Sequence, residues 1–108
     1  MGRRMGERSI SAEVAREYLR DVEPMWKAFW FHMHLVAKNL EEFAVGLSSI
    51  TDEVFRYHTS GQKNDLAKWV QEVIGDSVLA RELSSVVSKE EAAEIVRTRV
   101  ATLRRAAE

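Results

Sequence analysis

The stretch from Thr51 to Ala80 constrains the fold most, because it places several helix starts and one helix stop close together. Thr51 is a favoured N-cap residue, and Asn64 is another that follows a polar loop. Gly75 is expected to stop the helix that Asn64 begins, in the left-handed conformation that glycine adopts without steric cost. Asp76 follows directly as the next N-cap. The pattern predicts a tight helix–loop–helix–turn–helix unit.

Similar signals flank this stretch. Ser11 and Asn39 are expected to cap two earlier helices, and Ser88 with Glu91 forms a capping box before the last one. Apolar residues at helical spacing support these helices: Val14, Tyr18, Leu19, Val22; Leu40, Phe43, Ala44, Leu47; Val54, Phe55; Leu66, Trp69, Val70, Val73, Ile74; Leu79, Leu83, Val86; Ala92, Ile95, Val96, Val100 and Leu103. We therefore predict a single all-α domain over residues 10–108, an irregular bundle of five or six short helices. Residues 1–9 are predicted to be a flexible arm.

The segment 25–39 allows two interpretations. At helical period, one stripe forms from Trp26, Phe29, Trp30, Met33 and Ala37. At period two, Phe29, Phe31, Met33 and Leu35 alternate with Trp30, His32, His34 and Val36. We favour a helix at the start of the segment, since Pro24 is well placed to begin one. A short extended segment near 29–36 remains the alternative.

The composition limits the classes of function. The chain has 108 residues, a formal net charge of -1 and no cysteine. It lacks the basic excess of a nucleic-acid-binding protein, and it lacks thiols for disulfides or thiolate chemistry. No apolar run has the length of a transmembrane helix, and no signal peptide is recognisable. We expect a cytoplasmic protein without membrane contact, for which nucleic acid is an unlikely partner.

The residues His58 and Asp65 resemble two members of a catalytic triad. The nucleophile would be Thr59 or Ser60, but no glycine-framed elbow surrounds either residue. We therefore expect a hydrogen bond between His58 and Asp65 that closes the loop over Trp69. A structural motif of fold-determining residues is predicted, with no catalytic residue: His58, Asn64, Asp65, Trp69, Gly75 and Asp76. We expect the protein not to be an enzyme.

Three histidines leave metal binding as an alternative. His32 and His34 would share one face of a strand, and His58 could join them only through the fold. No thiol or second carboxylate cluster supports such a site. We expect no metal and no cofactor, and we expect the imidazoles to be bonded to backbone or carboxylate groups.

Large apolar side chains are unusually dense between Met25 and Met33. Not all of them can face one core, and tryptophan and methionine are favoured at protein interfaces. Either this segment lies inside the bundle, or Met25, Trp26, Trp30 and Met33 contact another chain. The second interpretation predicts a non-enzymatic interaction module that self-associates or docks to a protein partner.

Arginines on the last helix suggest a further alternative. Arg97, Arg104 and Arg105 lie roughly on one face, where they could contact phosphate in a nucleic-acid-binding accessory protein. Acidic residues on the same helix favour a solvated face instead.

A longer pattern links several of these features. It comprises Phe29 and Phe31; Asn39, Leu40, Glu42 and Phe43; Phe55, Tyr57 and His58; Asn64, Asp65, Leu66, Trp69 and Val70; and Gly75, Asp76, Leu79 and Ala80. This pattern resembles an uncharacterised family of prokaryotic helical domains, a domain of unknown function. Phe43 and Leu66 differ from the family's usual leucine and aromatic residue. His-Met-His-Leu stands where members often have a glycine turn. The resemblance implies a helical fold and no activity.

Overall fold

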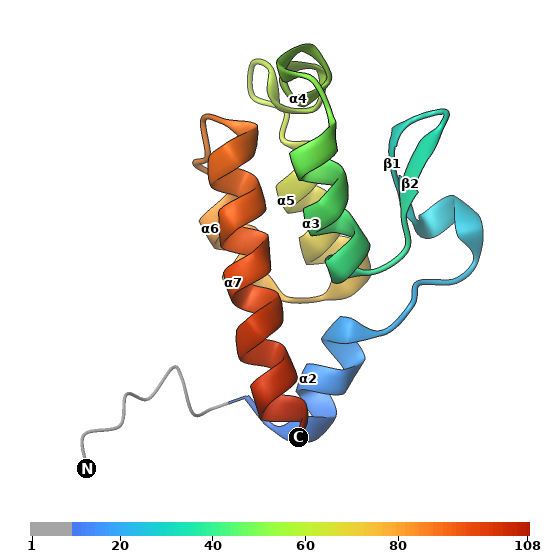
Figure 1. Cartoon of the computed structure of the whole chain (residues 1–108), viewed down its shortest axis with the longest axis vertical. Helices are drawn as coiled ribbons and strands as arrows, with labels where there is room; N and C mark the ends of the chain where they lie inside the picture. Colours follow the sequence, from blue (N-terminus) through green and yellow to red (C-terminus); the bar gives the residue numbers. More distant parts are fainter. Residues whose placement is uncertain (1–9) are drawn as a thin grey trace.

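A computed structural model describes residues 10–108 and shows a mostly helical fold with one small β-hairpin (Figure 1). The elements, in chain order, are α2 (Ala12–Leu19), the 3₁₀ turn η1 (Met25–Lys27), β1 (Phe29–His32), β2 (Leu35–Ala37), α3 (Leu40–Ser49), α4 (Asp52–Thr59), α5 (Asp65–Trp69), the π-helical turn η2 (Val70–Ile74), α6 (Ser77–Leu83) and α7 (Lys89–Ala107). The predicted bundle and its short extended segment are both confirmed. The arm predicted at residues 1–9 lies outside the described residues.

The N-caps predicted from the sequence are confirmed. Each capping side chain accepts a hydrogen bond from the backbone N–H three residues later, which satisfies a donor that the helix itself leaves free. These residues are Ser11, Asn39, Thr51, Asn64, Asp76 and Ser88. The capping box differs in one bond, because Glu91 accepts from the N–H of Val87 rather than from that of Ser88.

Helix α7 is the longest element, and the others are arranged around it. It packs along α3, lies against α2 near its C-terminal end, and also contacts α6 (Figure 1). The residues that it buries are mostly small or β-branched. They are Ala92, Ala93, Val96 and Val100, followed by Leu103 nearer the C-terminal end. Small side chains allow the neighbouring helices to approach closely, so the core forms along this face.

The first helix buries the predicted face with one exception. Tyr18 and Leu19 pack against the core as expected, whereas Val14 is exposed and Ala15 is fully buried in its place. Val22 is buried as expected, but it lies beyond the end of α2. Its N–H donates to the carbonyl of Lys38 at 2.7 Å, so this residue links the chain after α2 to the end of β2.

The preference for a helix after Pro24 is wrong beyond Lys27. Pro24 starts only the 3₁₀ turn η1, and an antiparallel hairpin follows, in which Phe29 pairs with Ala37 and Trp30 with Val36. The physical reason is the period of burial. Phe29 and Phe31 both enter the core, whereas the residues between and after them stay exposed. Only an extended chain places alternate residues on the same face.

A single helix was expected from Asn64 to Gly75, and the structure divides it. After α5 the chain widens into the π-helical turn η2, and the N–H of Gly75 donates to the carbonyl of Val70 at 2.8 Å. Gly75 has φ of 95°, the left-handed conformation that was predicted. The next helix, α6, ends at Leu83, so Val86 lies beyond it. Within residues 10–108, no helix is both long and apolar enough to cross a membrane.

Candidate functional site

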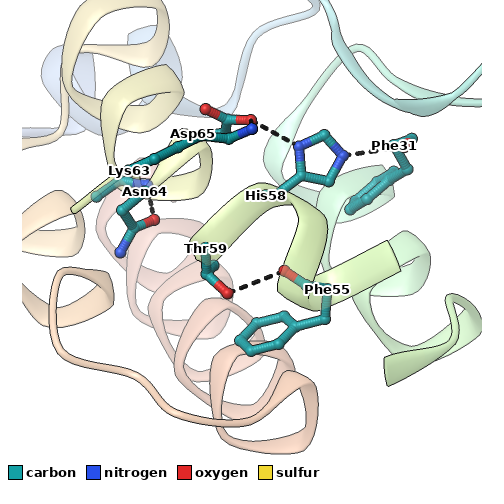
Figure 2. Close-up of polar contacts among 8 residues, drawn as sticks. Phe31, Phe55, His58, Thr59, Lys63, Asn64 and Asp65 are labelled. Atoms are coloured by element: carbon teal, nitrogen blue, oxygen red, sulfur yellow. Dashed lines mark hydrogen bonds and ion pairs between the residues drawn. The ribbon is translucent and has the colours of Figure 1, made fainter. Parts of the chain in front are cut away.

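His58 lies at the junction of the hairpin with α4 and α5 (Figure 2). Its Nδ1 is 2.8 Å from Oδ2 of Asp65, the contact expected from the sequence. Its Nε2 is 2.9 Å from the carbonyl oxygen of Phe31 in β1, a contact that the sequence did not indicate. The imidazole is only 6% exposed, and the ring of Phe29 is 5.0 Å away, centroid to centroid. His58 therefore joins α4 both to the next helix, α5, and to the more distant strand β1.

Asn64 and Trp69 connect the same region to its neighbours. Asn64 accepts from the N–H of Ala67 through Oδ1 and donates to the carbonyl of Leu83 through Nδ2, which ties the start of α5 to the end of α6. The indole N–H of Trp69 donates to the carbonyl of Lys27 at 2.8 Å. Phe29 packs between Trp69 and His58. The aromatic ring of Phe29, rather than the histidine itself, thus covers the tryptophan.

The hydroxyl group of Thr59, one of the two candidate nucleophiles, is bonded within its own helix. The Thr59 hydroxyl donates to the carbonyl of Phe55 at 2.9 Å, within α4 (Figure 2). Both nitrogens of His58 face oxygen atoms of Asp65 and Phe31. Neither nitrogen is therefore placed to accept a proton from a neighbouring hydroxyl, which general-base activation of a nucleophile requires.

The other acidic residue of the motif, Asp76, forms an ion pair that the sequence did not predict. Arg99 of α7 donates to both of its carboxylate oxygens, from Nε at 2.7 Å and from Nη2 at 2.9 Å. Asp76 is 1% exposed and also caps α6 through the N–H of Leu79. No local signal in the sequence links these two residues, which are separated by 23 positions.

A second arginine was also missed. Arg20, directly after α2, donates to the carbonyl of Val73 at 2.7 Å and to that of Ile74 at 3.4 Å. These carbonyls belong to the π-helical turn, whose end lacks intrahelical donors. A cation at the C-terminal end of a helix also interacts favourably with the helix dipole.

The four apolar residues suggested as an interface are all exposed. Trp26 and Met33 are 75% and 76% exposed, and Met25 and Trp30 are 54% and 45% exposed. The fold does not gather them in one place. The indole N–H of Trp30 donates to the carbonyl of Met25, so these two residues lie together, whereas Met33 is at the hairpin turn. Trp26 borders a separate hollow beside Trp69.

Met25 and Trp30 adjoin a larger apolar surface that the sequence did not indicate. A hollow of about 510 Å³ is lined by Met25, Leu35, Val36 and Val45 together with several polar residues. Val36 is the cross-strand partner of Trp30, so their side chains lie on the same face of the hairpin. We call Met25, Trp30, Val36 and Val45 the hairpin surface. It extends from η1 over the hairpin to α3.

Charges of both signs border the hollow. Lys38 Nζ is 2.8 Å from Oε2 of Glu42, and the backbone N–H of Lys38 donates to Oε1 of Glu42. The side-chain hydrogen bond to Glu42 raises the pKa of Lys38, and the same bond lowers the pKa of Glu42. Both groups are therefore charged at neutral pH.

The arginines of the suggested phosphate-binding face have partners within the chain. Arg97 donates to Glu94 and to Ser48, Arg104 forms an ion pair with Glu41, and Arg105 reaches Thr102. The pairs formed by Arg97 and Arg104 offset their charge locally. Among the three, Arg105 has only a neutral partner, Thr102, in the described part of the chain.

The histidines do not come together. His32 and His34 have ring centroids 6.4 Å apart, and the backbone N–H of His34 donates to Nδ1 of His32. His34 lies in the turn, beyond the end of β1, so the two residues do not lie on one strand. Over residues 10–108, no group of three or more His, Cys, Asp or Glu side chains is arranged to hold a metal ion.

The fold and these sites define a mostly helical domain in which an internal polar motif supports an exposed apolar hairpin. Comparisons with family models, with curated proteins and with solved structures find no match to this chain. That result is consistent with the resemblance to a family of unknown function.

Proposed function

We propose that this protein is a non-enzymatic interaction module that self-associates through the hairpin surface. The observation that supports this function is the exposure of large apolar side chains on the hairpin and on the turn before it. Small folded proteins gain free energy by burying such groups, at about 25 cal/mol per Å² of apolar area. A chain that leaves several of them in water is typical of one that buries them against a partner.

The shape of the hairpin surface favours a second copy as the partner. A protruding side chain, Trp30, lies beside the hollow lined by Met25, Val36 and Val45. In a two-fold symmetric contact each copy can place its protrusion in the hollow of the other. The charged side chains at the rim, Lys38 and Glu41, are paired with Glu42 and Arg104 within the same chain. A partner that is itself apolar at the contact, such as a second copy, therefore suits this surface.

The polar motif supports the non-enzymatic part of the proposal. His58 has both nitrogens directed at acceptor oxygens, and the Thr59 hydroxyl is bonded to its own helix. The other acid of the motif, Asp76, is paired with Arg99. These groups are used to connect elements of the fold, and none of them lines the hollow beside Met25.

Sedimentation over a wide concentration range tests self-association. The unaltered chain is expected to show a reversible dimer, and Trp30→Ser is expected to weaken dimerisation about tenfold or more, since a central tryptophan often dominates an interface. Val87→Ser is the matched control, because Val87 is 85% exposed and does not line the hollow. A chain that stays monomeric at millimolar concentration contradicts self-association and leaves a different protein partner as the occupant.

Two alternatives have direct tests. If α7 binds nucleic acid, a gel shift at low salt should weaken with added salt and when Arg104 and Arg105 are changed to Gln. The ion pairs of Arg97 and Arg104 with carboxylates do not favour this function. If the histidines bind a metal, elemental analysis of the purified protein should find a transition metal in stoichiometric amount.

A further inference from the structure

The two contacts of His58 require two donors. A backbone carbonyl such as that of Phe31 only accepts, and so does an ionised carboxylate such as that of Asp65. A neutral imidazole has one N–H and cannot donate to both. With distances of 2.9 Å to Phe31 and 2.8 Å to Asp65, the cluster needs one additional proton. The imidazolium form supplies it, and both bonds are then charge-assisted.

We propose that His58 is a pH-dependent latch, which in its doubly protonated form fastens the tip of the hairpin to α4 and α5. Phe31 is close to the hairpin turn, whereas the other bonds that hold this region lie nearer its base. These are the bond from Trp69 to the carbonyl of Lys27 and the bond from Val22 to the carbonyl of Lys38. Release of His58 from Phe31 therefore removes the polar bond nearest the turn, while the packing of the Phe31 ring on Phe43 and the bonds at the base remain.

The neighbouring groups determine the charge balance of the latch. From the start of α5, Asp65 faces the ring, and from the preceding loop Lys63 Nζ is 3.8 Å from the same carboxylate oxygen. On α4, the Tyr57 ring lies edge-on to His58 at 5.1 Å, and Lys63 Nζ is 4.1 Å above the Tyr57 ring. From β1, the ring contacts Phe29 and the carbonyl of Phe31. Lys63 thus offers Asp65 a second cation when His58 loses its proton.

The direction of the pH effect follows from proton counting. The latched state binds one more proton than a state in which the imidazole is neutral and the carboxylate is ionised. Low pH therefore favours the latched state, and its advantage is lost as pH rises. Histidine is the side chain whose charge ordinarily changes between pH 5 and 8. As pH rises the turn is thus expected to loosen, and, if the proposed function holds, this loosening regulates the adjoining hairpin surface.

Nitrogen NMR of the histidine ring tests the latch in the dilute monomer. At pH 6 both ring nitrogens of His58 should carry protons. As pH rises, the loss of one ring proton should coincide with faster amide exchange near the hairpin turn. After correction for intrinsic exchange rates, the increase should be about tenfold, as for the loss of one hydrogen bond to a charged group. A neutral ring at pH 6, or protection that does not change when the ring titrates, overturns the proposal.

Two variants separate the latch from other effects. Asp65→Asn removes the carboxylate and should abolish the pH dependence of tip protection. Asp52→Asn, an exposed acid in the first turn of α4, should leave it unchanged. If the Asp65 variant does not fold, the ring measurement on the unaltered chain still decides. If turn protection changes as the His58 ring titrates but the chain never dimerises, only the proposed function is rejected. Dimerisation with a neutral His58 ring rejects only the latch.

Discussion

Asp76 shows how much of this structure depends on single polar side chains. The residue lies directly after Gly75, whose left-handed conformation turns the chain from the π-helical turn into α6. Its carboxylate caps α6 and accepts two bonds from Arg99 of α7. One buried acid thus joins a turn, a helix start and the longest helix of the domain.

Changing Asp76 to Asn should lower the free energy of unfolding by about 3 kcal/mol. The side chain keeps its size and can still cap α6, but Arg99 then remains buried without a compensating charge. Urea denaturation measures the effect, with Asp52→Asn as an exposed control. Adding Arg99→Met should recover part of the loss, because it removes the unpaired cation. A loss equal to that of the control contradicts a structural role for the pair.

Between elements, α3 meets the hairpin through an unusually close contact. Gly46 lies on α3 where a Cβ atom would be 2.2 Å from Cε2 of Phe31. The ring of Phe31 packs on the ring of Phe43, which lies on α3 like Gly46, and the two ring centroids are 5.7 Å apart. The absence of a side chain at Gly46 therefore gives β1 its position against α3.

Changing Gly46 to Ala should destabilise the protein even though alanine is the better helix former. The gain in helix propensity is about 1 kcal/mol, and overpacking a core costs about 1–3 kcal/mol. The ring of Phe31 must also move, and the carbonyl of that residue holds His58. Thermal unfolding measures the net effect, and Phe31→Leu in the same chain should reduce the penalty. A higher Tm for the Gly46 variant alone would show that the ring adapts freely.

The sequence indicates those elements whose signals are local. Every predicted N-cap is present, because a capping side chain and the N–H that donates to it lie only three residues apart. The conformation of segment 25–37 is not determined by local signals, because its apolar residues fit two periods. Packing of Phe29 against Phe43 and Trp69 selects the extended form. The bonds from His58 to Phe31 and from Arg99 to Asp76 depend on tertiary structure. The hollow beside Met25 also depends on tertiary structure.

On the scale of the whole molecule, the described chain is elongated, with principal extents of 45 × 29 × 21 Å. Helix α7 runs beside α3 and reaches α2, while the hairpin lies away from α7, beyond α3 (Figure 1). The hairpin surface nevertheless meets the arginine face of α7 at α3, where Val45 lines a second hollow together with Arg97 and Arg104.

Small-angle X-ray scattering should distinguish the two assembly states. The Cα radius of gyration is 13.7 Å, close to the value of about 13 Å expected for a compact chain of this length. A dimer through the hairpin surface should have a radius of at least about 17 Å. A dilution series should move between these limits, and Trp30→Ser should stay near the lower one. A radius that does not change with concentration in either chain contradicts dimerisation.

The π-helical turn also affects how the length of this segment can vary. Its hydrogen bonds span one residue more than those of an α-helix, as in the bond from the N–H of Gly75 to the carbonyl of Val70. Deleting one residue between Val70 and Ile74 would therefore allow an ordinary α-helix to continue, with little rotation of the chain that follows. Asp76 could still reach Arg99, and Arg20 could still reach the carbonyls before Gly75. Homologous chains that lack one residue here are thus expected to keep both contacts.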